Sequence, residues 1–235
     1  METNIYKIDP WEIIERGWDP GKVMGSESIF SIGNGAMGQR ANFEEDFSGK
    51  TFKGSYIGGI YYPDKTKVGW WKNGYPEYFA KVINAPSWIG ISILIDGILL
   101  DLNKVDKIEK FERKLDMKNG LYERSISINT NNNLKVEIDS KRFLSMKRKH
   151  IGAISYNIKC SRDVKITLSP YIDFDVSNDD SNWDEKFWET TEKINTLNKS
   201  LVKSKVKKTG FKVITYMKAD LYDNNVKLEK PFIAK

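Results

Sequence analysis

The sequence has a single cysteine, Cys160, and a single histidine, His150. One cysteine cannot form a disulfide within the chain, and the polar neighbours of Cys160 offer no partner for a metal or redox site. One histidine excludes a histidine-rich metal site and a histidine dyad. We therefore expect no metal and no cofactor, with Cys160 on a strand and His150 at the start of a strand.

Long apolar runs are equally scarce, since no stretch of about 18 apolar residues occurs that could cross a bilayer. Mean hydropathy is -0.53 and 30% of the residues are charged, which fits a soluble surface. Segment 1–10 is polar where a secretory signal needs a basic start and a continuous apolar stretch. These absences argue against a membrane protein and predict a cytoplasmic location.

A net charge of +6 and a pI near 9.1 raise nucleic acid as a partner, because clustered lysine and arginine bind phosphate. Basic residues cluster at 141–150 and at 199–208. Apolar residues interrupt the first cluster, as expected where a strand turns. They alternate with lysine in the second, which is typical of a solvated strand edge guarded by lysine. Because no nucleic-acid-binding motif accompanies them, we expect no nucleic-acid partner.

Short runs of alternating apolar and polar residues dominate the chain. The clearest lie at 134–138, 154–158 and 164–168, and each is bounded by turn-forming residues, with Pro170 closing the third. Alternation of this kind indicates strands with one buried and one solvated face. We predict consecutive antiparallel strands.

The strongest local prediction is a hairpin over 91–102, because Asp96-Gly97 favours a tight turn with positive φ at both central residues. Helix signals are few: a short helix over 9–17 and a helix-like stretch over 184–193. Repeated short strands without βαβ alternation predict an all-β fold, a large antiparallel two-sheet β-sandwich with little helix.

A glycine-rich motif and two acidic motifs could indicate a cofactor, catalytic or metal site. Segment 33–38 matches G-x-G-x-x-G, but no helix signal follows it, so we expect a glycine-rich turn and no dinucleotide site. Glu44 and Glu45 could be paired carboxylates, yet sequence neighbours rarely flank a scissile sugar bond, and a solvated acidic turn is favoured. The acidic stretch 173–185 lacks the spacing of a calcium loop, so no metal is expected.

The segment 70–76 is the most suggestive loop. Flat aromatic faces stack on sugar rings, while lysine and asparagine can donate hydrogen bonds to hydroxyl groups. An aromatic loop packed on the sheet or on a partner domain explains the same residues. The candidate carbohydrate-binding residues are Trp70, Trp71, Lys72, Asn73 and Tyr75.

Several longer runs resemble one known family. They are Asp9-Pro10-Trp11, the run 27–45, the run 61–76, Arg142-Phe143-Leu144-Ser145 and the run 182–188. Together they resemble the N-terminal domain of glycoside hydrolase family 65, in its maltose phosphorylase branch. The resemblance implies a super-sandwich of the galactose mutarotase-like type over residues 1–220, followed here by a short tail, 221–235.

In complete enzymes of this family, the resemblance implies, the sandwich precedes a helical linker and an (α/α)6 barrel. Those enzymes are dimers that cleave an α-glucoside with inorganic phosphate as co-substrate, inverting the anomeric centre. A glutamic acid in the barrel protonates the leaving oxygen. The barrel has no counterpart in this sequence, so no catalytic residue is carried over and the chain alone is expected to be inactive.

Three functions stay open. The first is a non-catalytic domain that supports a catalytic barrel, provided in cis or in trans, and that contributes to a homodimer. The second is a free-standing carbohydrate-binding module that takes an α-glucosyl disaccharide. The third is one half of a split phosphorylase. Neither the disaccharide nor the oligomeric state follows from the sequence.

Overall fold

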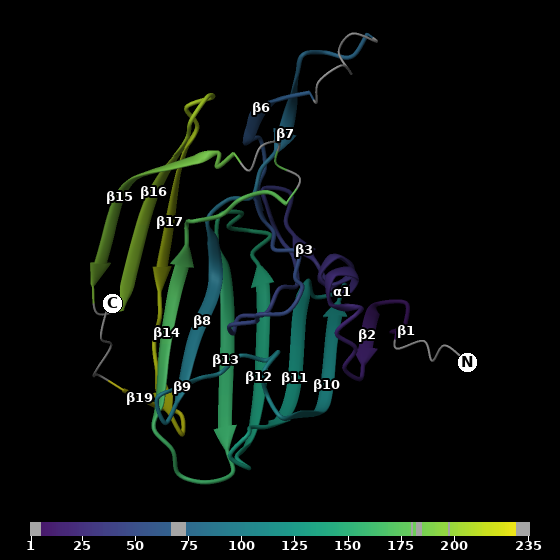
Figure 1. The fold of residues 1–235 in the computed structure, drawn as a ribbon, viewed down its shortest axis with the longest axis vertical. Helices are drawn as coiled ribbons and strands as arrows, with labels where there is room; N and C mark the ends of the chain where they lie inside the picture. The colour runs from purple at the N-terminus through teal and green to yellow at the C-terminus, as the bar shows by residue number, and fades with distance from the viewer. Residues whose placement is uncertain (1–5, 67–73, 180, 182–184, 197, 229–235) are drawn as a thin grey trace. The chain divides into compact units, whose positions relative to one another are not determined.

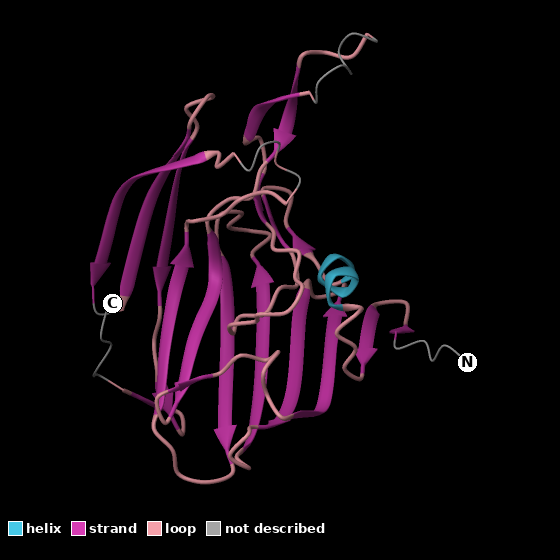
Figure 2. Ribbon diagram, in the orientation of Figure 1, coloured by secondary structure: helices cyan, strands magenta, loops and turns pink. Residues whose placement is uncertain are grey.

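The computed structural model describes residues 6–66, 74–179, 181, 185–196 and 198–228. Among these residues strands predominate and nearly all of their pairings are antiparallel, with one short helix (Figure 1 and Figure 2). The predicted all-β class with little helix is confirmed. Among the described residues, no helix has the length and apolar character to span a membrane.

The chain forms two compact units, and each is described by itself. The first comprises 1–54 with 92–168, and the second comprises 55–91 with 169–235. Strands β8 (Ser87–Ile95) and β14 (Ile166–Asp173) run from one unit into the other.

An antiparallel sheet of six strands, in the order β1-β2-β10-β11-β12-β13, forms the frame of the first unit. Its strands are β1 (Tyr6–Ile8), β2 (Glu12–Arg16), β10 (Lys107–Asp116), β11 (Leu121–Asn129), β12 (Lys135–Leu144) and β13 (Gly152–Cys160). Buried and exposed residues alternate without interruption along β12. This confirms the strands predicted at 134–138 and 154–158, while Cys160 ends β13 and His150 lies in the turn before it.

The two faces of this sheet differ in chemistry. One face is buried and includes Val136 and Ile138. The other carries charges that pair across strands: Lys114 lies opposite Glu123, which lies opposite Lys141. Their ion pairs measure 2.8 and 2.7 Å. Along this row, the exposed face of the six-stranded sheet therefore balances its charges within the chain.

Short elements complete the first unit. They are α1 (Val23–Ile29), β3 (Ile32–Gly33), β4 (Met37–Gln39) and β9 (Ile98–Leu99). The predicted hairpin is confirmed: Ile95 pairs with Ile98, and Asp96 and Gly97 have φ values of 50° and 83°. Positive φ at both residues is what the Asp-Gly sequence favours.

The second unit contains the antiparallel sheet β15-β16-β17, the hairpin β6-β7 and the small pair β18-β19. The bounds are β5 (Ser55–Ile57), β6 (Tyr61–Lys65), β7 (Tyr78–Val82), β15 (Trp188–Thr196), β16 (Lys199–Val206), β17 (Lys212–Lys218), β18 (Tyr222–Asp223) and β19 (Val226–Lys227). Its core gathers around Tyr62, Ile83, Phe187, Trp188 and Val206. The second unit thus buries apolar side chains of its own.

Several local predictions were wrong. No helix forms over 9–17, because residues 12–16 form β2 and the buried Glu15 lies opposite Arg113 there. From Trp188 onward, a strand also replaces the helix predicted over 184–193, where the β-branched Thr190 and Thr191 favour an extended chain. Residues 12–16 pair with the distant strand β10, and residues 188–196 pair with the next strand, β16; in both places strand pairing overrides the local signal.

The remaining corrections concern strand limits and positions. The strand predicted at 164–168 begins at Ile166 and continues through Pro170 to Asp173. The lysine-rich segment 199–208 is not a sheet edge: its strand, β16, lies between β15 and β17. The valines of β16 are buried on one face of the sheet, and its lysines therefore project from the other face.

Candidate functional site

The predicted sugar-binding loop connects β6 to β7. Trp70, Trp71, Lys72 and Asn73 lie outside the described residues, so their role stays a prediction. Tyr75 is described and is 61% exposed. At the base of the loop, the backbone N–H of Thr66 donates to the carbonyl of Glu77 over 2.9 Å, which closes the hairpin.

A buried ion pair anchors the same hairpin. Asp64 of β6 and Lys81 of β7 approach within 2.6 Å, and both side chains are buried. Further along the hairpin, Tyr61, Tyr78 and Phe79 have exposed aromatic rings. Phe79 lies opposite Asp64, on the same face as the ion pair, whereas Tyr61 and Tyr78 lie on the other face. The hairpin is therefore fixed on one face and presents two tyrosine rings on the other.

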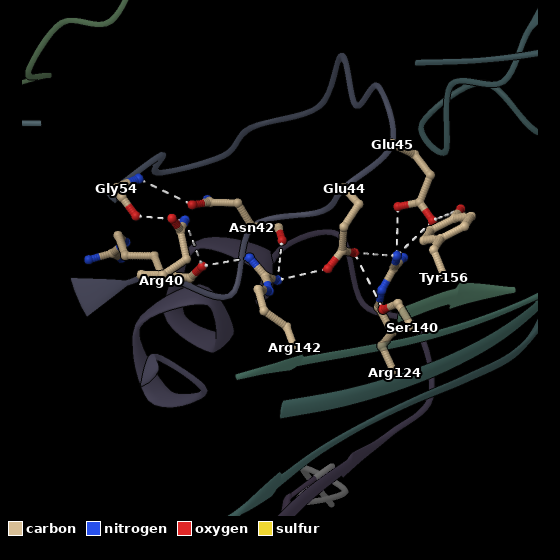
Figure 3. A network of polar contacts seen from close by, with 10 residues as sticks. Arg40, Asn42, Glu44, Glu45, Gly54, Arg124, Ser140, Arg142 and Tyr156 are labelled. Atoms are coloured by element: carbon tan, nitrogen blue, oxygen red, sulfur yellow. Dashed lines mark hydrogen bonds and ion pairs between the residues drawn. The ribbon is translucent and has the colours of Figure 1, made fainter. Parts of the chain in front are cut away.

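Glu44 and Glu45 do not form the solvated acidic turn that the sequence predicted. They are 1% and 4% exposed, and each lies 2.7 Å from the Arg124 guanidinium (Figure 3). Arg142 adds a second cation, 3.1 Å from the other oxygen of Glu44. The prediction failed because both arginines lie about 80 or more residues away in the chain, on β11 and β12.

The strand register places this network on one row of the buried face. Arg113, Arg124, Ser140 and Tyr156 lie opposite one another across β10, β11, β12 and β13. Ser140 Oγ donates to Glu44 over 3.4 Å, and the Tyr156 hydroxyl donates to Glu45. Two adjacent buried arginines would repel each other, so the carboxylates are needed to balance the row.

The arginine of β12 also ties the network to the backbone. Arg142 donates to the carbonyl of Asn42 over 2.9 Å. The Asn42 side chain accepts from the backbone N–H of Gly54 over 3.1 Å, and Gln39 donates to the carbonyl of Gly54 over 2.9 Å. The network therefore fixes the loop over 40–54 onto the buried face of the sheet.

The protonation states follow from these contacts. Burial alone would raise the pKa of Glu44, but the charges of Arg142 and Arg124 outweigh burial and lower it. Burial and the neighbouring Glu45 charge raise the pKa of Tyr156 well above its usual value. Glu44 is therefore ionised and Tyr156 neutral at pH 7. Enclosed carboxylates already bound to arginine cannot act as general acid or base on a sugar.

A second buried pair joins β2 to β10. Glu15 binds Arg113 and accepts from Ser26 of α1 over 2.7 Å, and the Ser26 hydroxyl lies 2.7 Å from that of Tyr6. Burial raises the pKa of Glu15, and the Arg113 charge offsets this only in part. Glu15 and Glu44 therefore have pKa shifts of opposite sign.

We expect these two carboxyl groups to affect the pH dependence of stability in opposite ways. Glu44, with a lowered folded-state pKa, stabilises the fold above its usual value of 4.5, and this contribution is lost as pH falls below it. Glu15, with a raised pKa, contributes stability at low pH that is lost as pH rises through the folded-state value. Urea denaturation across acid and neutral pH measures both effects.

Matched variants separate the two carboxyl groups. Glu44→Gln is expected to reduce the increase in the free energy of unfolding that occurs as pH rises toward 4.5. Glu15→Gln is expected to remove the decline of stability above pH 4.5. Changes of slope with the same sign in both variants would contradict the assignment.

The glycine-rich segment is a turn, as predicted. Gly35 has a φ of 81°, and the segment links β3 to β4 without a helix after it. The Asn34 amide donates to the carbonyls of Ser145 and Lys149, both over 2.9 Å, while its oxygen accepts from two backbone N–H groups of the turn. Asn34 therefore fastens the turn to the loop that precedes β13.

The acidic stretch 173–185 shows ordinary surface pairing. Asp175 pairs with Lys186, and Asp180 and Asp184 lie outside the described residues. Within the described ranges, no three acidic, cysteine or histidine side chains are grouped to hold a metal ion. The absence of metal stays a prediction.

Fold and site together define an antiparallel all-β domain whose buried carboxylates serve its architecture. Residues 13–234 match the family described as "Glycosyl hydrolase family 65, N-terminal domain". The chain belongs to this family, as the resemblance indicated, and represents its N-terminal domain.

Individual relatives agree with this assignment. Maltose phosphorylase from Bacillus subtilis is 46% identical over 190 residues, which cover 80% of this chain and 25% of the relative. Alpha,alpha-trehalose phosphorylase from Thermoanaerobacter brockii is 34% identical over 182 residues, 74% of this chain and 23% of the relative.

A solved structure supports the fold. A protein from the human microbiome, assigned as a kojibiose phosphorylase, superposes with a TM-score of 0.80 at 28% identity. The match covers 95% of this chain and 31% of that one. The chain therefore spans about a quarter to a third of the phosphorylases it matches.

Proposed function

We propose that this chain is the non-catalytic N-terminal domain of a maltose phosphorylase-type protein. The observation that carries the proposal is the difference in coverage: the family match includes 13–234, nearly the whole chain, whereas the chain spans 25% of maltose phosphorylase. The parent reaction would be phosphorolysis of an α-glucosyl disaccharide to glucose 1-phosphate and glucose. The role of this chain is to support the part that carries out that chemistry.

The geometry of the buried acidic groups supports this role. Glu44 and Glu45 are the acidic pair that the sequence singles out, and both are enclosed and bound to arginine. A glycosidase-type mechanism needs one carboxylic acid that can protonate the leaving oxygen in an accessible site. Glu44 is ionised, and both side chains are buried and without access to a sugar.

The partners follow from the same proposal. A catalytic barrel, in cis or in trans, would bind inorganic phosphate and the disaccharide, and this chain would need no cofactor. Two such assemblies would pair to form a homodimer. Its location would be the cytoplasm. If the barrel is a separate polypeptide, this chain would be one half of a split phosphorylase.

An assay of the purified chain tests the absence of catalysis. We expect no glucose 1-phosphate from maltose and phosphate above the level of a heat-denatured sample. Release that rises in proportion to the concentration of the chain would contradict the proposal.

A second candidate function is carbohydrate binding through the β6-β7 hairpin, favoured by the exposed Tyr75 and Tyr78. Titration of maltose and kojibiose against tryptophan fluorescence tests this function, with the double variant Trp70→Ala and Trp71→Ala for comparison. A saturable signal that the variant loses supports binding. An unchanged signal at sugar concentrations of about 1 mM or more contradicts it.

A further inference from the structure

One face of the sheet β15-β16-β17 combines exposed apolar side chains with several lysines. Val202, Ser204, Val206 and Val213 are buried on its inner face. On the outer face, strand register brings apolar side chains of all three strands into one row: Ile194 lies opposite Leu201, which lies opposite Tyr216. Ile214 of β17 lies opposite Lys203, one row further along the same face.

The apolar side chains of this face are open to solvent. Ile194 is 46% exposed, Tyr216 is 55% exposed and Ile214 is 60% exposed. Single exposed apolar residues are common, but neighbours gathered on one row of a regular sheet form a contiguous patch. Such a patch with a polar rim is typical of a surface that binds another protein.

Lysines form the rim of the patch. Lys199 lies opposite Lys218 on one side of the apolar row, and Lys205 lies opposite Lys212 on the other. Like charges placed directly opposite each other on adjacent strands destabilise a sheet. We call the outer face of β15-β16-β17, with its apolar row and these lysines, the lysine-rimmed face.

Only part of this positive charge is balanced within the chain, where Glu189 and Glu192 of β15 lie opposite Lys205 and Lys203. Lys203 pairs with Glu192, and Lys218 with Asp220 at 3.6 Å. Across the described part of the chain, no ion pair is formed by Lys199, Lys205 or Lys212. The exposed face of the six-stranded sheet is different, because there Glu123 lies between two lysines and pairs with both.

We propose that the lysine-rimmed face binds the part of a family 65 phosphorylase that this chain does not span, on a surface with an apolar centre and an acidic rim. The inference rests on the proposed function, and it names the surface through which this domain contacts the part that it supports. Charge complementarity decides the occupant: a second copy of the same face would bring lysines against lysines. Coverage of 25% of maltose phosphorylase leaves ample polypeptide for this role.

Co-purification tests the inference. The tagged chain is co-expressed with the part of Bacillus subtilis maltose phosphorylase that follows the matched region, and the amount retained is measured at low and high salt. The double variant Ile214→Ser with Tyr216→Ser is expected to lower retention at least about tenfold, as for central aromatic anchors. Lys199→Glu with Lys212→Glu, in which each new glutamate faces a lysine on the neighbouring strand, is expected to lower it most at low salt.

Matched controls lie on other surfaces. Lys107→Glu with Lys110→Glu reverses two exposed charges on the six-stranded sheet that lie opposite uncharged residues, and Met146→Ser removes an exposed apolar side chain. All of these variants are expected to melt close to the wild-type temperature, because the altered side chains are exposed. The controls are expected to retain the partner as the wild type does.

The outcomes separate the two proposals. Retention by wild type and controls, with loss in both lysine-rimmed-face variants, supports the inference. Equal retention by every variant overturns it and leaves the proposed function standing. Failure of the wild type to retain the partner contradicts both. Self-association of the chain that the face variants abolish also overturns the inference, because the occupant would then be a second copy.

Discussion

Replacing Arg124 with methionine is expected to lower the free energy of unfolding by about 3–5 kcal/mol, the usual effect of removing one partner of a buried ionic group. The change leaves Glu44 and Glu45 buried without the cation that contacts both. Methionine keeps most of the side-chain length, so the loss of stability reflects the missing charge more than the missing volume. Urea denaturation measures it through the midpoint and the slope.

A compensated variant keeps this prediction testable if Arg124→Met alone fails to fold. Adding Glu44→Gln and Glu45→Gln removes the stranded charges, and neutral replacement of a whole buried ionic group is often tolerated. We expect the triple variant to be more stable than the single one. A single variant within about 1 kcal/mol of wild type would show that the network contributes little.

Replacing Phe187 with alanine is expected to cost about 3–5 kcal/mol, typical of deleting a buried aromatic ring. Phe187 is 1% exposed, and its ring centroid lies 4.3 Å from that of Tyr62 in the core of the second unit. Truncation would leave a cavity beside Trp188 and Val206. Thermal or urea denaturation measures the loss.

Amide hydrogen exchange locates the damage caused by Phe187→Ala. Protection is expected to fall in β15, β16 and β17, because these strands share the core that the ring fills. The control Phe143→Ala alters a ring that is 42% exposed and is expected to cost less than the buried truncation. Equal losses in the two variants would contradict the assigned core.

Local patterns predicted the elements whose partners are close in sequence. The alternation along β12 and the Asp96-Gly97 turn are signals carried by the residues themselves. Residues 12–16 carried a helix signal but form a strand, since Glu15 meets its arginine only when the chain is extended beside β10. Sequence alone does not place that arginine.

The candidate site shows the same limit more sharply. Glu44 and Glu45 look like a solvated turn because Asp46 extends the acidic run, and the arginines that pair them come from β11 and β12. Arg124 stands between Glu123 and Ser125 in the sequence and so resembles a surface cation. An arginine at a position that strand alternation assigns to the buried face is the signal that could have revealed the network.

Complementation is the measurement that tests the supporting role most directly. The part of Bacillus subtilis maltose phosphorylase that follows the matched region is expressed with and without this chain, and release of glucose 1-phosphate from maltose and phosphate is followed. We predict release only when both polypeptides are present, and none from the chain alone. Release by the chain alone, or equal release by the relative's polypeptide without it, would contradict the supporting role.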